Sequence, residues 1–405
     1  MLLHGKQLCL INTSLYDEQR ARINGVGRYS KTLLFTHKQR GIILMLRYRF
    51  LPGNPGVTLF DAICDMDNLH LAHQNASRGK SFYKEVKMVN SNPDYYLKQI
   101  QDSLLNRTFT TSPYNIFQRM EGEKLRTIYK LPYYPDRIVQ WAILQIIGPM
   151  MERHFIYDTY SSIKGKGPLS CMQRIHQATY YYHKRRMNDM EYYLKMDIRK
   201  FYPSIDHERL KHKYLKLFKD PNLLGLIFNI IDSVLPEEGI PIGNYLSQFS
   251  GNLYLSEFDH VIKEVYKIKH YYRYMDDMVL FGDNAGDLNE MTNKIIGMLS
   301  YEGLIVKPNY LIRRLIEGLD FVGYKIFPTH ILLRKRIKMN LKRKCIAYNG
   351  KMLTLHRRSS IGSLRGFAYH SNGYNLQKRY IIPLYVSWML SVNRIGTIYK
   401  HTSVV

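Results

Sequence analysis

Two adjacent carboxylates in the middle of the chain have the residue types and the surroundings of a metal-dependent site. Asp276 and Asp277 lie between two short runs, Tyr271–Tyr274 and Met278–Phe281, whose aromatic and aliphatic residues are typical of β-strands. We therefore predict a β-hairpin with the acid pair at its tip. Adjacent ionised carboxylates repel each other, and a fold tolerates them best where a divalent cation lies between them.

A third acid supports this interpretation. Asp197 lies near the end of another predicted strand, Tyr192–Ile198. Three carboxylates from two neighbouring strand ends match the ligand set of a two-metal phosphoryl-transfer site, where one cation activates a hydroxyl and the other holds a triphosphate. A bare Asp-Asp pair is more often an acidic turn that faces solvent, but the apolar strands on both sides argue against that alternative here.

The charge of the chain indicates a polyanionic partner. Its 59 Lys and Arg residues against 33 Asp and Glu residues give a formal net charge of +26 at pH 7. No acid follows Asp320, whereas residues 321–405 hold sixteen Lys or Arg. This stretch favours nucleic-acid binding over a merely solvated basic face. The basic residues predicted to contact nucleic acid lie on a potential helix and are Arg334, Lys335, Arg336, Lys342, Arg343 and Lys344.

Composition excludes several other classes of protein. No apolar run approaches the roughly 20 residues that a bilayer span needs, and the first residues lack the features of a secretion signal. We therefore expect a cytoplasmic protein with no membrane partner. The four cysteines lie far apart, which argues against a disulfide scaffold or a zinc site. They are Cys9, Cys64, Cys171 and Cys345.

Apolar periodicity predicts the elements that position the acids. Helical spacing begins at Thr58, after a Pro/Gly cluster at 52–56 that marks a boundary, so residues 1–55 form a separate segment of uncertain order. Residues 207–235 and 244–266 are predicted helices. The second of these has a small-residue face that a bulky group could approach, made of Ser247, Ser250 and Gly251. Asp206 is expected to cap the helix that follows it.

Five blocks occur in order along the chain, with gaps that match a known family. They are Lys195–Asp206, Gly239–Gln248, Tyr274–Asp277, Gly303–Pro308 and Leu319–Tyr324. In this order they resemble the three catalytic blocks, the basic block near the triphosphate and the primer grip of the reverse transcriptases. Upstream, Lys124–Arg126 and Tyr134–Gln140 resemble the fingers of that family. The resemblance runs from about residue 58 to residue 400.

The resemblance implies an α+β right-hand polymerase fold and an RNA-directed DNA polymerase. The implied domains are fingers at 56–190, palm at 191–325 with a helical connection at 207–240, and a basic helical thumb at 326–405. Asp197, Asp276, Asp277 and the backbone of Ile198 would hold two Mg²⁺ ions, for which Mn²⁺ could substitute. The implied partners are a template RNA, a primer or cDNA strand and deoxynucleoside triphosphates.

Further site residues follow from the same blocks. The implied nucleotide-binding residues are Lys124, Arg126, Lys166, Tyr202, Ile242, Gly243, Gln248 and Lys307. The implied nucleic-acid contacts outside the thumb are Tyr274, Met275, Phe321, Gly323 and Tyr324. Tyr202 stands where the family keeps an aromatic that blocks a ribose 2′-hydroxyl, and its alternative is an ordinary core aromatic. Ile163 stands where the family usually has an Arg, and Lys164 or Lys166 could supply that charge.

Two substitutions in the second block narrow the resemblance. Ile242-Gly243 and Ser247-Gln248 replace the usual Gln-Gly and Ser-Pro, which is similar to the reverse transcriptases of diversity-generating retroelements. Such enzymes copy an RNA with errors at adenines, and they work with a small basic accessory variability protein. A bacterial, phage or mobile-element origin is implied. Two alternatives remain: an antiphage defence reverse transcriptase, and a non-catalytic RNA-binding protein, against which the three intact acids argue.

Overall fold

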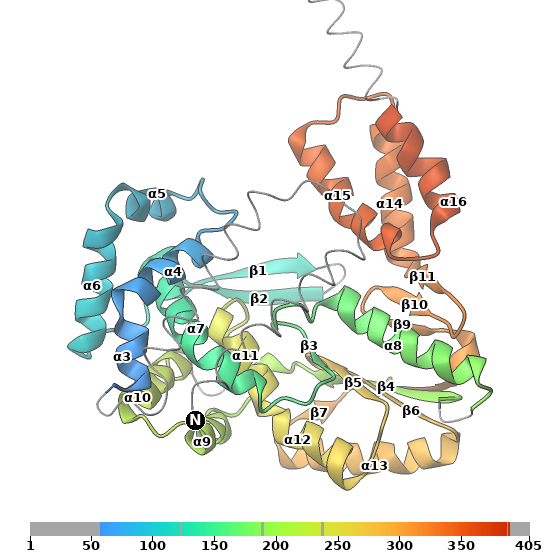
Figure 1. Cartoon of the computed structure of the whole chain (residues 1–405), viewed down its shortest axis with the longest axis horizontal. Helices are drawn as coiled ribbons and strands as arrows, with labels where there is room; N and C mark the ends of the chain where they lie inside the picture. The colour runs from blue at the N-terminus through green and yellow to red at the C-terminus, as the bar shows by residue number, and fades with distance from the viewer. Residues whose placement is uncertain (1–56, 122–123, 188–189, 236–238, 387, 389–405) are drawn as a thin grey trace, which may run out of the picture. The chain divides into compact units, whose positions relative to one another are not determined.

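The computed structural model describes residues 57–121, 124–187, 190–235, 239–386 and 388 (Figure 1). By its internal contacts the chain divides into two compact units, residues 1–58 and residues 59–405. Every element below belongs to the second unit. The segment predicted at residues 1–55 lies outside the described residues. None of the described helices is both long enough and apolar enough to cross a membrane.

A six-stranded sheet lies at the centre of this unit. Its order is β3-β5-β6-β4-β7, with β8 also paired to β4, and only β3 and β5 run parallel. The strands are β3 (Thr159–Tyr160), β4 (Tyr192–Arg199), β5 (Tyr271–Tyr274), β6 (Asp277–Gly282), β7 (Ile305–Val306) and β8 (Leu311–Arg314). The predicted strand at Tyr192–Ile198 and the predicted hairpin around the acid pair are both confirmed.

The two faces of the sheet enter different cores. Successive side chains of a strand point to opposite faces, so Leu194 and Met196 of β4 pack with the core beneath α13 (Ala285–Tyr301), and Tyr193 packs with α8 (Pro168–Lys184). Figure 1 shows α13 and α8 on opposite sides of the sheet. By the same alternation, Asp197 points to the α8 side.

The elements before the sheet form a mostly helical group with one protruding hairpin. They are α3 (Leu59–Cys64), α4 (Met66–Ala76), α5 (Lys84–Ser91), α6 (Pro93–Leu105), β1 (Asn115–Glu121), β2 (Lys124–Lys130), η1 (Tyr133–Arg137) and α7 (Ile138–Glu152). The helical pattern predicted from Thr58 is interrupted at Asp65. The Asp65 carboxylate accepts a hydrogen bond from the backbone N–H of Asp67 at 2.8 Å and so begins a new helix.

The helical stretch predicted at 207–235 is confirmed and is divided into two helices. They are α9 (His207–Leu217) and α10 (Pro221–Ile231). Pro221 has no N–H to continue a preceding helix but fits the first turn of a new one, and Asp220 caps α10 through the N–H of Asn222 at 3.0 Å. Asp206 caps α9 through the N–H of Arg209 at 2.8 Å, as predicted.

The helix predicted at 244–266 is confirmed in extent and divided into three segments. They are α11 (Tyr245–Tyr254), α12 (Ser256–His260) and the π-helical turn η4 (Val261–Val265). A short 3₁₀ turn, η2 (Tyr202–Ser204), lies between β4 and α9. A Cβ added at Gly251 would lie 3.1 Å from the Phe201 ring and 3.4 Å from the Tyr202 ring. The small-residue face of α11 therefore admits two aromatic rings.

A three-stranded sheet connects the centre to the basic C-terminal helices. Its strands are β9 (Leu319–Phe321), β10 (Tyr324–Ile326) and β11 (Ile331–Leu333), with the 3₁₀ turn η5 (Leu315–Glu317) before them. The helices are α14 (Lys335–Tyr348), α15 (Leu355–Tyr369), α16 (Tyr374–Leu376) and η6 (Gln377–Ile381). The predicted helix over the basic cluster is confirmed. The domain boundary predicted between residues 325 and 326 passes through β10.

Gly239 provides a test of the packing of its loop against the backbone of η2. Its φ of +64° disfavours any side chain, and an added Cβ would lie 2.6 Å from the backbone carbon of Pro203. We expect Gly239→Ala to lower the free energy of unfolding by about 2 kcal/mol, because backbone atoms must shift. Urea denaturation followed by circular dichroism measures this. Gly225→Ala in α10, where an added Cβ meets open space, is the matched control and should be neutral or stabilising. Equal losses in both variants would contradict the analysis.

Candidate active site

The pairing of β4 with β6 brings the three predicted carboxylates together. Asp197 and Asp277 are direct partners in the register of the two strands. Asp276 lies in the adjoining turn, where its carbonyl accepts a hydrogen bond from the N–H of Ile198 at 3.3 Å. Burial, and then the charges of Asp277 and Asp197, raise the pKa of Asp276 to about 6. Burial also raises the pKa of Asp277. The carboxylates are therefore close enough to repel one another.

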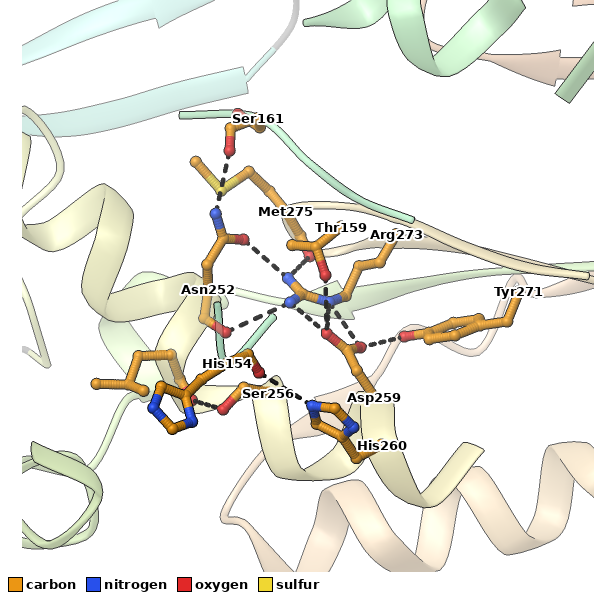
Figure 2. Close-up of polar contacts among 11 residues, drawn as sticks. His154, Thr159, Ser161, Asn252, Ser256, Asp259, His260, Tyr271, Arg273 and Met275 are labelled. Carbon is orange, nitrogen blue, oxygen red and sulfur yellow. Dashed lines mark hydrogen bonds and ion pairs between the residues drawn. The ribbon is translucent and has the colours of Figure 1, made fainter. Parts of the chain in front are cut away.

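The turn that carries the acids has a left-handed residue at its tip. Tyr274 pairs with Asp277, so Met275 and Asp276 form the turn. Met275 has a φ of +55°, which is uncommon for a residue other than glycine. Its carbonyl accepts a hydrogen bond from Nη1 of Arg273 at 3.0 Å (Figure 2). The structure thus fixes the backbone immediately before Asp276.

Beneath this turn lies a buried ion pair that the sequence analysis did not predict. The side chains of Arg273 and Asp259 are both 0% exposed, and Nη2 of Arg273 lies 2.6 Å from Oδ2 of Asp259. Nη1 also donates to Oδ1 of Asn252 at 3.0 Å, and the Tyr271 hydroxyl donates to Asp259 at 2.6 Å (Figure 2). One signal was present in the sequence: Arg273 is the only charged residue in an otherwise aromatic strand.

Lys307 is placed directly beside the carboxylates. Its backbone N–H donates to the carbonyl of Asp197 at 2.8 Å, and its ammonium pairs with Oδ2 of the same residue. The resemblance implied a position near the triphosphate, and the structure places this charge on Asp197. The positive charge offsets part of the repulsion among the acids, since it lowers the pKa of both Asp276 and Asp277.

The chemistry of this cluster fits a divalent cation. Oδ1 of Asp197 is buried and has no hydrogen-bond partner among the described residues. Such an orphaned oxygen, next to two carboxylates with raised pKa values, is what a cation would satisfy. The described residues contain no group of three or more His, Cys, Asp or Glu already arranged to hold a metal, in keeping with the pairing of Asp197 with Lys307. Ile198, whose backbone was predicted as a ligand, is fully buried beside Asp197.

Tyr202 lies between the turn and α11. Its hydroxyl contacts Sδ of Met275 at 3.4 Å, and its ring packs where Gly251 leaves space. Burial, with a contribution from Asp276, raises the pKa of Tyr202 above its usual value, and Arg126 opposes that shift. Tyr202, Arg126 and the acids thus lie in one neighbourhood, and their role in nucleotide binding stays a prediction.

The loop before α11 is tied to the β1–β2 hairpin. The Ile242 carbonyl accepts a hydrogen bond from the N–H of Tyr129 in β2 at 3.3 Å. Gly243 follows with a φ of +126°, and a Cβ there would lie 2.9 Å from the Tyr129 carbonyl oxygen. Gln248, one turn into α11, accepts a hydrogen bond from the Ser162 hydroxyl at 3.1 Å. Lys124 begins β2, where its backbone pairs with Glu121.

Lys166, predicted as a nucleotide-binding residue, makes its contacts with Tyr157. Its ammonium donates to the carbonyl of Tyr157 and lies 4.7 Å from the centre of that residue's ring. These contacts engage the ammonium within the protein, and the assignment of Lys166 as a nucleotide-binding residue stays a prediction. Ile163 is buried in the core.

The predicted primer grip is mostly internal. Phe321 and Tyr324 are only 0% and 2% exposed, and an added Cβ at Gly323 would lie 2.8 Å from the Phe367 ring of α15. The side chains of Phe321 and Tyr324 thus pack in the core with α15, and Gly323 allows the close approach of Phe367. The contact of these three residues with nucleic acid stays a prediction, and the structure leaves only the backbone of this turn for it. Val322, partly exposed with a φ of +41°, lies at that turn. Tyr274, also predicted as a contact, is half-buried beside the acids.

The basic cluster on α14 divides into two groups. Arg334 pairs with Asp320, Lys344 donates to the Ser360 hydroxyl, and Lys342 lies 5.4 Å from the Tyr380 ring centre. The three exposed residues of the predicted cluster are Lys335, Arg336 and Arg343. Only this second group presents its charge mainly to solvent.

The sheet with its acid-bearing hairpin and the helices around it define the right-hand α+β fold of template-copying polymerases. A sequence profile described as reverse transcriptase (RNA-dependent DNA polymerase) matches residues 119–325, which is just over half of the 405 residues. The chain therefore belongs to the reverse transcriptase family.

Similar solved structures were also found. One is telomerase from Candida albicans with a fragment of telomeric RNA, at 13% identity and a TM-score of 0.44, covering 67% of this chain and 56% of that one. Another is apo telomerase from Candida tropicalis, at 12% identity and a TM-score of 0.44, covering 74% of this chain and 64% of that one. The chain spans less than two thirds of either structure. No curated protein sequence matched it.

The raised pKa of Asp276 predicts how stability changes with pH when no divalent cation is present. The folded chain holds this proton more tightly than the unfolded chain does, so the stability that the group contributes is greatest below about pH 4 and is lost as the pH rises through about 6. The loss should be at most about 3 kcal/mol. Urea unfolding in EDTA between pH 4.5 and 7.5 measures it.

Asp276→Asn is the control for this prediction and should flatten the pH dependence. Adding Mg²⁺ at pH 7 should restore stability to the wild type and less to the variant. The same pH dependence in both proteins would show that Asp276 is not the group that titrates.

Proposed function

We propose that this chain is an RNA-directed DNA polymerase that extends a primer on an RNA template. The observation that carries the proposal is the convergence of Asp197, Asp276 and Asp277 where β4 pairs with β6, inside the region that matches the family. Membership of the reverse transcriptase family supports nucleotidyl transfer in general. The partners would be a template RNA, a primer or cDNA strand and deoxynucleoside triphosphates.

We divide the chain into fingers from residue 56 to 190, a palm from 191 and a basic helical thumb. Because β9, β10 and β11 form one sheet, we move the start of the thumb from residue 326 to Arg334. In this division the exposed thumb residues Lys335, Arg336 and Arg343 would contact the phosphate backbone, where positive charge gives affinity without sequence preference.

The three carboxylates and the Ile198 carbonyl would hold two divalent cations, Mg²⁺ in the first place and Mn²⁺ as a substitute. When bound, such cations lower the pKa of the attacking hydroxyl and neutralise the charge of the triphosphate. The chain's own residues orient the reactants. Lys307, beside Asp197, would bring a positive charge to the triphosphate. Tyr202, against Gly251, would form a wall that excludes a ribose 2′-hydroxyl.

The aspartates provide the direct test. Asp197→Asn, Asp276→Asn and Asp277→Asn should each reduce primer extension on an RNA template by about 1,000-fold or more, because a lost metal ligand costs several kcal/mol of transition-state stabilisation. Binding of an RNA–DNA duplex, measured by filter retention, should stay within about three-fold, since phosphate contacts supply most of the affinity. Primer extension with a radiolabelled primer measures the rate.

Asp206→Asn is the matched control. Asp206 caps α9, and asparagine caps helices equally well, so this variant should keep normal activity. An Asp276→Asn enzyme that retained more than about a tenth of wild-type extension would refute the assignment.

We further propose that the enzyme copies adenines with frequent errors, as the resemblance to diversity-generating retroelements implies. A small basic accessory variability protein would then be an additional partner. The structural support is the loop around Ile242, which is tied to β2 through Tyr129 and lies just before α11 with Gln248. A glutamine at 242 could hydrogen-bond near the nascent base pair and favour correct geometry, whereas isoleucine offers only apolar contact.

The fidelity proposal is tested by Ile242→Gln on an adenine-rich RNA template. We expect the adenine error rate to fall about five-fold or more, which corresponds to a hydrogen bond of about 1 kcal/mol. Sequencing of the cDNA products measures the errors. Ile242→Leu, which keeps the apolar character, is the control and should keep the wild-type spectrum. A wild-type error rate at adenine no higher than at other bases would defeat this proposal and leave the polymerase assignment intact.

A further inference from the structure

The buried Arg273 guanidinium connects three separate segments of the chain. Its own strand is β5, its ion-pair partner Asp259 lies on α12, and its amide partner Asn252 lies on α11 (Figure 2). The guanidinium donates through all three of its nitrogens. Nε and Nη2 bond Asp259 at 2.8 and 2.6 Å, and Nη1 bonds both Asn252 and the Met275 carbonyl at 3.0 Å.

The geometry of these bonds is specific to arginine. Burial of an isolated cation is strongly unfavourable, and Asp259 neutralises it. A lysine could keep that charge, but a single ammonium cannot span Asp259, Asn252 and Met275 as the planar fork does. The bonds from Nη1 are therefore additional to what neutralising the charge requires.

One of these additional bonds ends at the strained point of the acid turn. The Met275 carbonyl is part of the peptide that leads into Asp276, and Met275 has a φ of +55°. Strained backbone persists where its surroundings determine it. By strand alternation, Arg273 points to the opposite face of the sheet from Asp277. Arg273 thus holds the turn from one face of the sheet and does not cover the Asp277 carboxylate on the other face.

Asn252 extends the same connection to a loop beside α11. Its Nδ2 donates to the carbonyl of Ser161 at 3.0 Å. Ser161 and Ser162 both have positive φ values, +79° and +59°, and the Ser162 hydroxyl bonds Gln248. Gln248 and Asn252 are one helical turn apart on α11. Asn252 therefore bonds both Arg273, which holds the acid turn, and the loop that contacts Gln248.

We propose that Arg273 and Asn252 form a positioning pair that sets the location of Asp276 and Asp277 relative to α11 and its preceding loop. This rests on the proposed function, because it assigns the pair to the carboxylates of that site. The pair does not contact substrate. It acts through the Met275 carbonyl and the Ser161 carbonyl. Loss of the Arg273 bonds displaces the metal ligands and leaves the bond from Asn252 to the Ser161 loop in place.

The experiment compares Arg273→Lys with wild type in the full-length chain. Displacement of reacting groups by about 1 Å costs up to about 100-fold in rate, so we expect a kcat lower by about that factor, with the KM for the nucleotide within about three-fold. Mn²⁺ binding without nucleotide or primer, measured by electron paramagnetic resonance, should weaken about ten-fold, because two ligands have moved. Binding of Mn²⁺ does not depend on turnover.

Lys213→Met is the matched control for a purely structural effect. Lys213 is 5% exposed and lies 3.3 Å from both Glu257 and Glu302, which are 49% and 17% exposed. This variant therefore also removes a buried cation from its ion pairs, on α9 and without a contact to the acid turn. It should lose stability but keep the wild-type kcat and Mn²⁺ affinity. Asn252→Ala is a second test variant that removes no charge. It should fold and weaken Mn²⁺ binding in the same direction as Arg273→Lys.

The outcomes separate the inference from the proposed function. Wild type that neither extends a primer nor binds Mn²⁺ through Asp276 refutes the proposed function. Wild type that does both, together with Arg273→Lys or Asn252→Ala variants that fold and bind Mn²⁺ as wild type does, overturns the positioning pair. Should Arg273→Lys fail to fold, Asn252→Ala alone decides between these results.

Discussion

The centre of this structure must accommodate the electrostatic repulsion among three neighbouring carboxylates. The β4–β6 register places Asp197 opposite Asp277, and the turn adds Asp276. Burial makes the repulsion stronger, because fewer water molecules screen it. The chain opposes this repulsion with the ammonium of Lys307, which pairs with Asp197. On the opposite face of the sheet, Arg273 holds the backbone of the turn through the Met275 carbonyl.

Much of this arrangement could be predicted from the sequence, for local reasons. Strand alternation and the apolar runs identified β4 and the β5–β6 hairpin, because those signals depend only on neighbouring residues. The break at Pro221 was also readable, since a proline preceded by aspartate marks the start of a helix. The partnership of Arg273 with Asp259 was not predicted. It joins a strand to a helix. The sequence shows one charge in the aromatic strand of Arg273, whereas Asp259 lies in a polar segment that gives no sign of burial.

Motif resemblance located residues well and oriented them less well. The block Leu319–Tyr324 was found in the right place, yet its aromatic side chains point into the core and not toward a ligand. The ammonium of Lys166, predicted to face a nucleotide, likewise donates to the Tyr157 carbonyl. A block in a sequence fixes the backbone path, and the direction of a side chain depends on packing partners that come from elsewhere. For these residues the partner was α15 or a neighbouring tyrosine.

The small sheet β9–β11 has a mechanical consequence. Its first turn is locked onto α15 by Gly323 and Phe367, and its last strand runs directly into α14 at Arg334. Lys195, on the same strand as Asp197, also donates to the carbonyl of Asp320 at 2.8 Å. The sheet therefore acts as a stiff bracket between the acid-bearing strand and the basic helices. This sheet sets the distance between the charged surface of α14 and the carboxylates. A nucleic-acid strand bound to those helices would therefore reach the carboxylates at a fixed distance from its point of attachment.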